Sequence, residues 1–272
     1  MSKIIFFGTP DVAVTTLSAL CDAGYTPVVV ITAPDRRQGR GMRLTASPVK
    51  EYALEKGIPV LQPEKLDDEF LLQLAPYSFD LAIVIAYGKI LSEPLINLPR
   101  LGTINIHYSL LPRWRGASPI ESAILAGDTE TGIAIQQMVY ELDAGPILAQ
   151  QTTEIDRNET APELRVRLGD MGAELLVEIL PDILAGTKVA VPQSGESTHA
   201  KKIQKSHGFL DIKNDDDKMM YNKYRAYAEW PRTYFTQHGK RYIITAAHFE
   251  KRKFMIDRVI PEGESERKWI NF

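Results

Sequence analysis

The chain has 272 residues, of which 44% are hydrophobic and 25% charged, with a formal net charge of −3. This is the composition of a soluble globular protein with a sizeable core, and the overall charge does not indicate a nucleic-acid binder. The single cysteine, Cys21, excludes an intramolecular disulfide. The N-terminus has no apolar signal-peptide region and no apolar run reaches membrane-spanning length, so we expect a cytoplasmic protein without membrane contact.

The charge is unevenly distributed along the chain. Residues 201–272 hold 16 Lys and Arg against 10 Asp and Glu, a net charge of +6, and residues 1–200 hold 16 against 25, a net charge of −9. A basic tail on an acidic body favours contact with a polyanion, although a lysine-rich solvated surface would give the same count.

The first two-thirds of the chain alternate short apolar runs with helical patterns. This predicts an α/β fold with a Rossmann-like, mostly parallel sheet covered on both faces. Ser47-Pro48 has the pattern of a helix N-cap followed by proline at the first helical position. The predicted strands cover residues 3–7, 27–31, 59–61, 81–86, 103–107, 132–139 and 147–153, and the predicted helices cover residues 11–20, 48–56, 66–74, 119–126 and 161–184.

The residue pattern changes after the long helix, where residues 189–206 mix small, polar and proline residues without periodicity. We interpret this stretch as a linker between a domain at 1–188 and a small C-terminal domain at 207–272. The tail pattern predicts a helix at about 216–228 and strands at 234–235, 241–246 and 254–259. These elements indicate a small β-barrel-like module.

Two polar side chains end the strand at 103–107. Asn105 and His107 share one face of that strand because they are two residues apart, and open α/β sheets place their ligands at such carboxyl ends. An amide beside an imidazole suits stabilisation of an oxyanion. A surface histidine and an asparagine that caps a turn would give the same sequence pattern. Asp143 lies in a polar turn with Gly145 and could either form that turn or orient an imidazole.

The segment 34–43 carries four arginines, Arg36, Arg37, Arg40 and Arg43, in a glycine-containing loop. It reads either as a solvated loop or as a mobile arm that meets phosphate or nucleic acid. The sheet domain holds neither a P-loop nor a dinucleotide fingerprint, and no cluster has metal-ligand spacing, so no metal is expected.

Several segments, taken in order, resemble the folate-dependent formyltransferases, most closely those that use methionyl initiator tRNA as acceptor. The resemblance covers about residues 1–190 nearly continuously. Each segment alone is a weak signal, but their order and spacing together are specific. The matching segments are Phe7-Gly8-Thr9-Pro10-Asp11, Pro34-Asp35-Arg36 to Gly41, Ser47-Pro48-Val49-Lys50, Ala86-Tyr87-Gly88, Asn105-Ile106-His107 with Ser109 to Ala117, Gly127 to Gly132 and Leu142-Asp143-x-Gly145.

The resemblance implies 10-formyltetrahydrofolate as donor, the α-amine of methionyl initiator tRNA as acceptor and Asn105, His107 and Asp143 as the catalytic set. It places folate around Tyr87, Gly88, Ser109, Leu110, Leu111, Pro112 and the Asp143 loop, and tRNA on the four arginines. We also expect a monomer. In the implied reaction the amine attacks the formyl carbon, Asn105 and a protonated His107 stabilise the oxyanion, and Asp143 favours the imidazolium and helps move a proton.

The sequence departs from the family in two places. Tyr108 stands where the family has a small residue, and its ring either narrows the site or points outward. The C-terminal OB-like barrel is shortened to some sixty-five residues. An amino-sugar N-formyltransferase, a formyltetrahydrofolate hydrolase and a non-catalytic folate- or RNA-binding relative therefore remain as alternatives.

Overall fold

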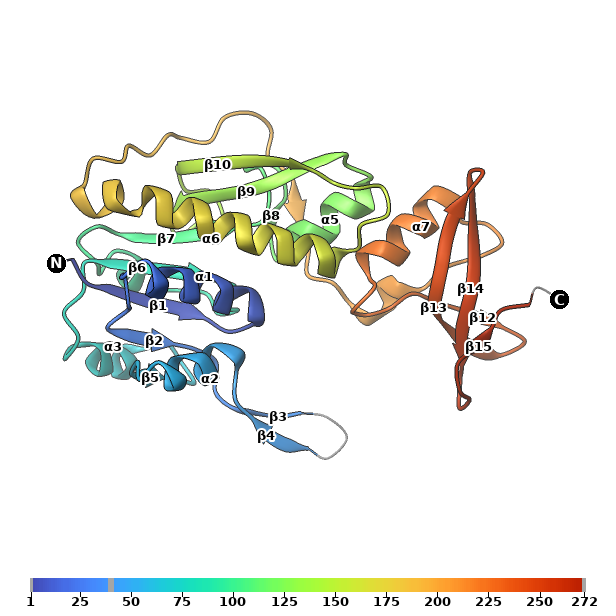
Figure 1. Ribbon diagram of the computed structural model, residues 1–272, viewed down its shortest axis with the longest axis horizontal. Helices are drawn as coiled ribbons and strands as arrows, with labels where there is room; N and C mark the ends of the chain where they lie inside the picture. Colours follow the sequence, from blue (N-terminus) through green and yellow to red (C-terminus); the bar gives the residue numbers. More distant parts are fainter. Residues whose placement is uncertain (1, 39–41, 271–272) are drawn as a thin grey trace. The chain divides into compact units, whose positions relative to one another are not determined.

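A computed structural model describes residues 2–38 and 42–270 of the chain. Within them, a seven-stranded sheet has the order β10-β9-β7-β6-β1-β2-β5 (Figure 1). Neighbouring strands from β5 to β7 are parallel, and β9 runs antiparallel to β7. The predicted mostly parallel α/β fold is confirmed. The strands are β1 (Ile4–Gly8), β2 (Val29–Ile31), β5 (Val60–Leu61), β6 (Leu81–Ile85), β7 (Thr103–His107), β9 (Glu130–Gln137) and β10 (Ile147–Glu154).

The helices follow the predicted order with small shifts at their ends. The Ser47 side chain caps α2 as predicted, because its Oγ accepts a hydrogen bond of 3.1 Å from the Lys50 amide. A short helix after β6, α4, was not expected. The helices are α1 (Asp11–Asp22), α2 (Pro48–Glu55), α3 (Asp68–Leu74), α4 (Glu93–Ile96), α5 (Pro119–Ala126), α6 (Ala161–Ala185), η1 (Lys205–Gly208) and α7 (Asp217–Ala226).

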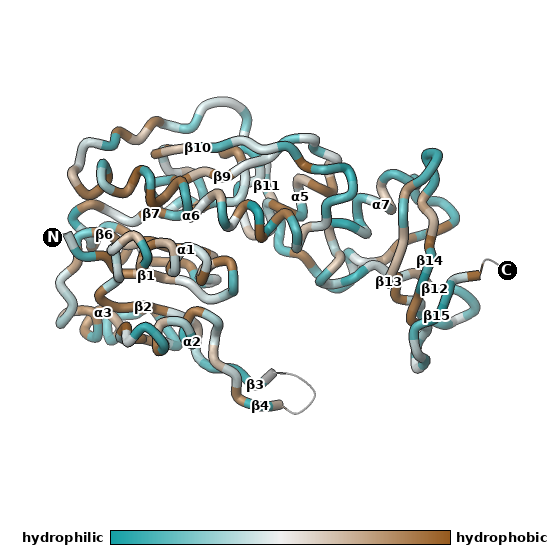
Figure 2. Tube along the Cα trace, viewed as in Figure 1, coloured by the Kyte–Doolittle hydropathy of each residue, from teal (hydrophilic) through white to brown (hydrophobic). Residues whose placement is uncertain are grey.

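Because side chains alternate between the two faces of a sheet, each buried strand supplies apolar residues to both faces. Hydrophobic residues are brown in Figure 2. Phe7 of β1 and Val84 of β6 pack with α3 and α4 in one apolar cluster. On the other face lies α6, where Gly169 approaches Val12 of α1 and Gly172 approaches Ile106 of β7. Since Ile106 faces α6, its neighbours Asn105 and His107 face the α3 and α4 side.

The arginine-containing segment, which its sequence predicts to be a loop, forms a β-hairpin. Strands β3 (Arg36–Gln38) and β4 (Arg43–Thr45) pair antiparallel, with Arg37 opposite Leu44. The aspartate before β3, Asp35, is held by the Lys50 ammonium at 2.7 Å and by the Gln62 amide at 2.8 Å. Two segments of the sequence resemblance are thus joined by an ion pair at the base of the hairpin.

Two compact units divide the chain differently from the boundaries drawn on the sequence. One comprises residues 1–115, 132–152 and 166–197, and the other 116–131, 153–165 and 198–272. The segment 189–206, read as a linker, contains the short strand β11 (His199–Ala200), and Val191 pairs with Ile147 of β10. Its first half therefore belongs to the first unit.

The second unit contains the small β module that the tail pattern predicts. Its sheet has the order β12-β13-β14-β15, antiparallel throughout, and its apolar side packs on α7 through an aromatic cluster that includes Tyr221 and Phe254. Helix α7 begins at the Asp216 cap, whose carboxylate accepts from the Met219 amide at 3.0 Å. The strands are β12 (Tyr234–Gln237), β13 (Lys240–Glu250), β14 (Lys253–Pro261) and β15 (Arg267–Lys268); the remaining short strand, β8, covers Arg115–Gly116.

Candidate active site

The carboxyl end of β7 carries the two polar side chains singled out in the sequence. Asn105 is partly buried, and His107 is only 5% exposed. Asn105 lies opposite Gln136 of β9, and His107 lies opposite Ala134. Because paired residues project to the same face of a sheet, Asn105, His107 and Gln136 form one polar group on the α3 and α4 side.

Both ring nitrogens of His107 face oxygen atoms. Nε2 lies 2.8 Å from the carbonyl oxygen of Trp114, and Nδ1 lies 3.6 Å from Oδ2 of Asp143. A carbonyl oxygen can only accept, so Nε2 must carry a proton. Nδ1 faces the carboxylate oxygen of Asp143, so a proton on Nδ1 would point toward a negatively charged acceptor.

Asp143 is brought to His107 by the loop between β9 and β10. Its side chain is 10% exposed, and Oδ1 accepts a hydrogen bond of 2.8 Å from Nε2 of Gln136, while Oδ2 faces the histidine. The loop comes close to β9 because Gly145 has no side chain, and a Cβ there would clash with the carbonyl oxygen of Gln137. The structure thus brings together the three residues predicted as catalytic.

The two residues whose oxygen atoms face the ring nitrogens of His107 have left-handed backbones. Trp114 has φ of 61° and Asp143 has φ of 52°. For a bulky side chain such as Trp114 this conformation is costly, about 1–3 kcal/mol, and it persists only where the surroundings impose it. A strained tryptophan backbone beside a buried histidine is typical of a functional site.

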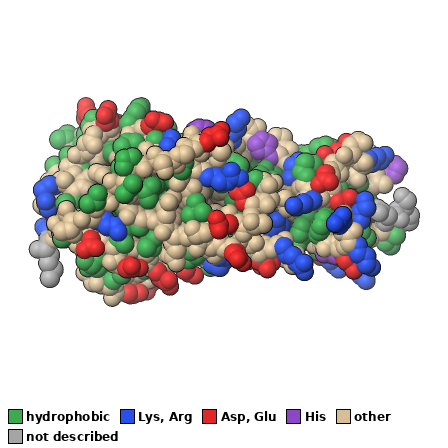
Figure 3. Space-filling model, turned by 90° about the horizontal axis from the view of Figure 1, so that it is seen from above, with side chains coloured by type: hydrophobic (Ala, Val, Ile, Leu, Met, Phe, Trp, Pro, Cys, Tyr) green, Lys and Arg blue, Asp and Glu red, His purple; other side chains and the backbone are tan. Residues whose placement is uncertain are grey.

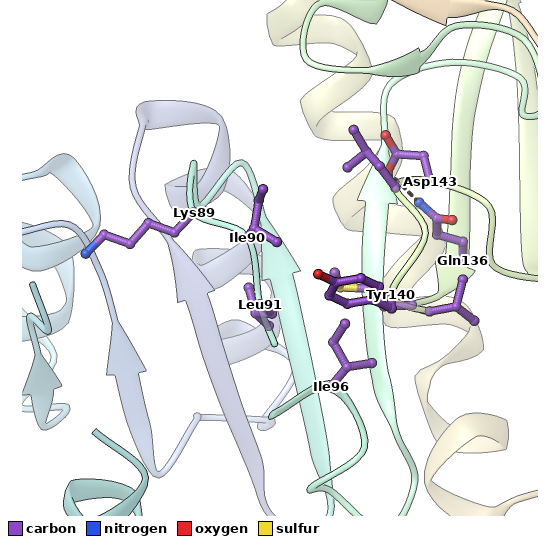
Figure 4. A pocket seen from close by; sticks show the side chains of 10 residues that line it. Lys89, Ile90, Leu91, Ile96, Gln136, Tyr140 and Asp143 are labelled. Atoms are coloured by element: carbon purple, nitrogen blue, oxygen red, sulfur yellow. Dashed lines mark hydrogen bonds between the residues drawn. The ribbon is translucent and has the colours of Figure 1, made fainter. Parts of the chain in front are cut away.

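A cavity of about 270 Å³ opens beside Asp143 (Figure 4). Its walls are mostly apolar, and the Lys89 side chain points away, donating to the carbonyl oxygen of Glu64 at 2.8 Å. The volume approaches the lower limit of ligand pockets, roughly 300–1,000 Å³. The lining residues are Lys89, Ile90, Leu91, Ile96, Gln136, Met138, Val139, Tyr140, Leu142 and Asp143.

Of the residues around which the resemblance places folate, those of the Asp143 loop line this cavity, and the other six do not. Tyr87 lies in the core, where its ring packs edge-on against Phe7 with centroids 5.3 Å apart. Burial raises the pKa of its hydroxyl to about 12, which keeps it protonated. Gly88 has φ of 82° and directs the chain toward Lys89 and the cavity wall.

The remaining four predicted folate residues, Ser109 to Pro112, form a tight turn before Trp114. Ser109 is fully buried, and its hydroxyl donates to the carbonyl oxygen of Arg113 at 2.5 Å. Gln150 donates to the carbonyl oxygen of Leu111 at 2.8 Å. These contacts shape the turn that carries the Trp114 carbonyl to His107.

Tyr108 does not narrow the site. It is 8% exposed and follows His107 on the strand, so it projects to the opposite face, where its ring edge lies near Gly172 of α6.

Three of the four predicted tRNA-binding arginines are described, and Arg40 lies outside the described residues. Arg36, Arg37 and Arg43 are exposed on the hairpin. Arg36 and Arg43 project to one face, since Arg43 pairs with Gln38, and Arg37 projects to the other. Over the C-terminal strands, Figure 3 shows a second gathering of Lys and Arg side chains.

Among the described residues, no group of three His, Cys, Asp or Glu side chains is arranged to hold a metal ion. In the same part of the chain, the helices are too short or too polar to cross a membrane.

Known proteins resemble the chain over most of its length. Residues 2–180 match the family model described as formyl transferase. The methionyl-tRNA formyltransferase of Methylococcus capsulatus is 44% identical over 234 residues, which cover 84% of this chain and 75% of the relative. That of Halorhodospira halophila is 49% identical over 211 residues, covering 77% and 68%.

Solved structures share the fold at lower identity. The N-formyltransferase from Helicobacter canadensis, solved with folinic acid and dTDP-3-aminofucose, has a TM-score of 0.67 at 17% identity and covers 94% of this chain and 95% of its own. A 4-N formyltransferase from Francisella tularensis has a TM-score of 0.70 at 20% identity, covering 90% and 97%. From the family match and these sequence relatives together, the chain belongs to the formyl transferase family.

Proposed function

We propose that the chain transfers a formyl group from 10-formyltetrahydrofolate to the α-amine of methionyl initiator tRNA. The observation that carries the chemistry is the His107–Asp143 pair, 3.6 Å apart, at the edge of an apolar cavity. The acceptor rests on the relatives, which are named methionyl-tRNA formyltransferases at 44% and 49% identity.

His107 and Asn105 stabilise the negative charge that develops on the formyl oxygen when the amine attacks the formyl carbon. Since Nε2 of His107 is bonded to Trp114, Nδ1–H is the ring donor that remains for the oxyanion. Nδ1 lies 3.6 Å from Oδ2 of Asp143, which is longer than a hydrogen bond, so its N–H is available to a substrate oxygen brought within reach. A donor of this kind is worth about 3–4 kcal/mol of the barrier.

Asp143 has two tasks in this scheme. Its charge favours the imidazolium form of His107, and its carboxylate receives the proton that the attacking amine loses, directly or through water. The proton then goes to the folate nitrogen as the bond from that nitrogen to the formyl carbon breaks. In this scheme the two substrates, these side chains and water account for every proton that moves.

The cavity beside Asp143 holds the ring system of the folate. Leu91, Ile96 and Met138 provide an apolar surface for a flat ring, and Asp143 and Gln136 supply polar groups at one end. In this proposal the formyl-bearing nitrogen lies near His107. The turn from Ser109 to Pro112 would border the rest of the cofactor.

Arg36, Arg37 and Arg43 meet the phosphate backbone of the tRNA. They are exposed, and Asp35 fixes the hairpin that carries them through Lys50 and Gln62. The +6 charge of residues 201–272 supplies a second basic surface.

The decisive experiment gives the purified protein 10-formyltetrahydrofolate with charged initiator tRNA, a nucleotide-linked amino sugar or buffer alone. We expect formylmethionyl-tRNA in the first arm only. Product only with the sugar would make the chain an amino-sugar N-formyltransferase, and formate in the buffer arm would make it a hydrolase. No turnover in any arm, with folate or tRNA still bound, would favour a non-catalytic relative.

A second experiment tests the hairpin. Replacing Arg37 and Arg43 by Ala should weaken tRNA binding and reduce the slope of log affinity against log salt by about 1–2 units. Donor binding should not change. An unaltered salt slope would remove the hairpin from the tRNA site.

A further inference from the structure

Gln193 lies in the segment that follows α6, far in sequence from the catalytic residues. Val191 pairs antiparallel with Ile147 through two main-chain hydrogen bonds of 2.7 and 2.8 Å. Continued by two residues, the same register sets Gln193 beside Gly145. The segment thus lies along the start of β10 and brings an amide side chain to the Asp143 loop.

The Gln193 amide joins two separate parts of the site. Nε2 donates to the carbonyl oxygens of Asp143 and Gly145, both at 2.8 Å. Oε1 accepts from Nε and Nη2 of Arg115 at 3.1 and 2.8 Å. Each end of the amide is therefore assigned, since a carbonyl accepts and a guanidinium donates.

These contacts close a ring around His107. Arg115 directly follows Trp114, whose carbonyl accepts from Nε2 of the histidine. Asp143, which the other end of Gln193 holds, faces Nδ1. Gln193 therefore spans the two backbone segments that carry both oxygen partners of the imidazole.

We propose that Gln193 is a positioning residue for formyl transfer, and that with Arg115 it sets the distance between Trp114 and Asp143 across His107. The inference rests on the proposed function. Trp114 and Asp143 both have left-handed backbones. Without the hydrogen bonds of Gln193 to Arg115 and to the Asp143 loop, both backbones would be free to adopt other conformations. A displacement of about 1 Å at a reacting group can lower a rate about 10²-fold.

Two substitutions separate this role from simple stabilisation. Gln193→Ala removes the hydrogen bonds to Arg115 and those to the carbonyl oxygens of Asp143 and Gly145. Gln193→Glu keeps an acceptor for Arg115, so the Trp114 side stays anchored, but replaces the donor by a carboxylate oxygen facing two carbonyl oxygens. Tyr52→Phe is the control, because it removes one side-chain hydrogen bond, from the Tyr52 hydroxyl to Oγ of Ser18 at 3.1 Å, that lies outside this ring.

The test measures kcat, the KM for 10-formyltetrahydrofolate, the pH profile of kcat and the thermal midpoint. In both Gln193 variants we expect kcat to fall about 10- to 100-fold, more than KM rises. We also expect the pH profile of kcat to change, because the displaced Asp143 carboxylate no longer lies beside the imidazole. The control should lose thermal stability alone.

The outcomes distinguish this inference from the proposed function. If wild type forms no formylated product, the proposed function fails. If wild type is active and Gln193→Glu keeps its kcat and pH profile, the positioning role is overturned. If Gln193→Ala is unfolded at the assay temperature, Gln193→Glu decides, since Arg115 retains its partner.

Discussion

Nδ1 of His107 lies 3.6 Å from Oδ2 of Asp143, while Nε2 of the same ring lies 2.8 Å from the carbonyl oxygen of Trp114. The two contacts are unequal, and the difference assigns the ring nitrogens. The hydrogen bond from Nε2 to the Trp114 carbonyl anchors the ring. The wider separation between Nδ1 and Asp143 leaves the Nδ1 donor for the substrate.

Replacing Asp143 by Asn should lower turnover far more than donor affinity. The amide can still accept from Gln136, so the loop keeps its place, but the negative charge beside His107 is lost. We expect single-turnover formylation to slow by about 10²-fold or more, with donor affinity within about threefold of wild type. A mutant as fast as wild type in a single turnover would show that this carboxylate has no part in the chemistry.

Gln136 supports the catalytic carboxylate from a buried position, 2% exposed, and donates to Oδ1 of Asp143 at 2.8 Å. Gln136→Met keeps the volume but removes the donor, so kcat should fall about tenfold, since hydrogen bonds to charged groups contribute roughly 1.5–3 kcal/mol. Gln136→Glu should be more harmful at neutral pH than at acid pH, because two carboxylates would then face each other. Equal activity of Glu and Met variants at all pH values would contradict this arrangement.

The apolar rim of the cavity can be tested with a matched pair of exposed residues. Ile90 is 83% exposed and lines the cavity, and Leu72 of α3 is 73% exposed and does not. Ile90→Asp should raise the KM for 10-formyltetrahydrofolate about tenfold or more, because burying an aliphatic side chain contributes roughly 1.5–3 kcal/mol. Leu72→Asp should leave that KM unchanged. The same KM in both variants would place the cofactor elsewhere.

The base of the hairpin should make stability depend on pH. The ammonium of Lys50 and then the amide of Gln62 lower the pKa of Asp35 below its ordinary value of 3.8. A carboxyl whose pKa is depressed by folding stabilises the native state above its unfolded-state pKa, and this contribution is lost as pH falls through the folded-state value. Asp35→Asn should therefore lower the thermal midpoint at pH 7.

The difference between Asp35→Asn and wild type should shrink as the pH is taken below about 4. Asp170→Asn, on an exposed position of α6, should show no such dependence. A gap in thermal midpoint that stays constant between pH 7 and pH 3 would mean that Asp35 acts through packing and not through its charge.

The sequence by itself determined the alternating elements, the Ser47 cap and the pairing of Asn105 with His107, because these depend on residues close together in the chain. Periodicity and spacing are local properties, and they survive without knowledge of the rest of the fold. The chain-order match to the formyl transferases likewise needed only the linear sequence.

Only the tertiary structure decided how the site is held. Gln136 meets Asp143 because β9 runs antiparallel to β7, and Gln193 reaches the same loop across fifty residues of sequence. Tyr87, around which the resemblance places folate, is buried against Phe7, because the turn after β6 directs its ring into the core. Such contacts depend on strand register and on which face a side chain takes, and no local pattern in the sequence encodes either for residues so far apart.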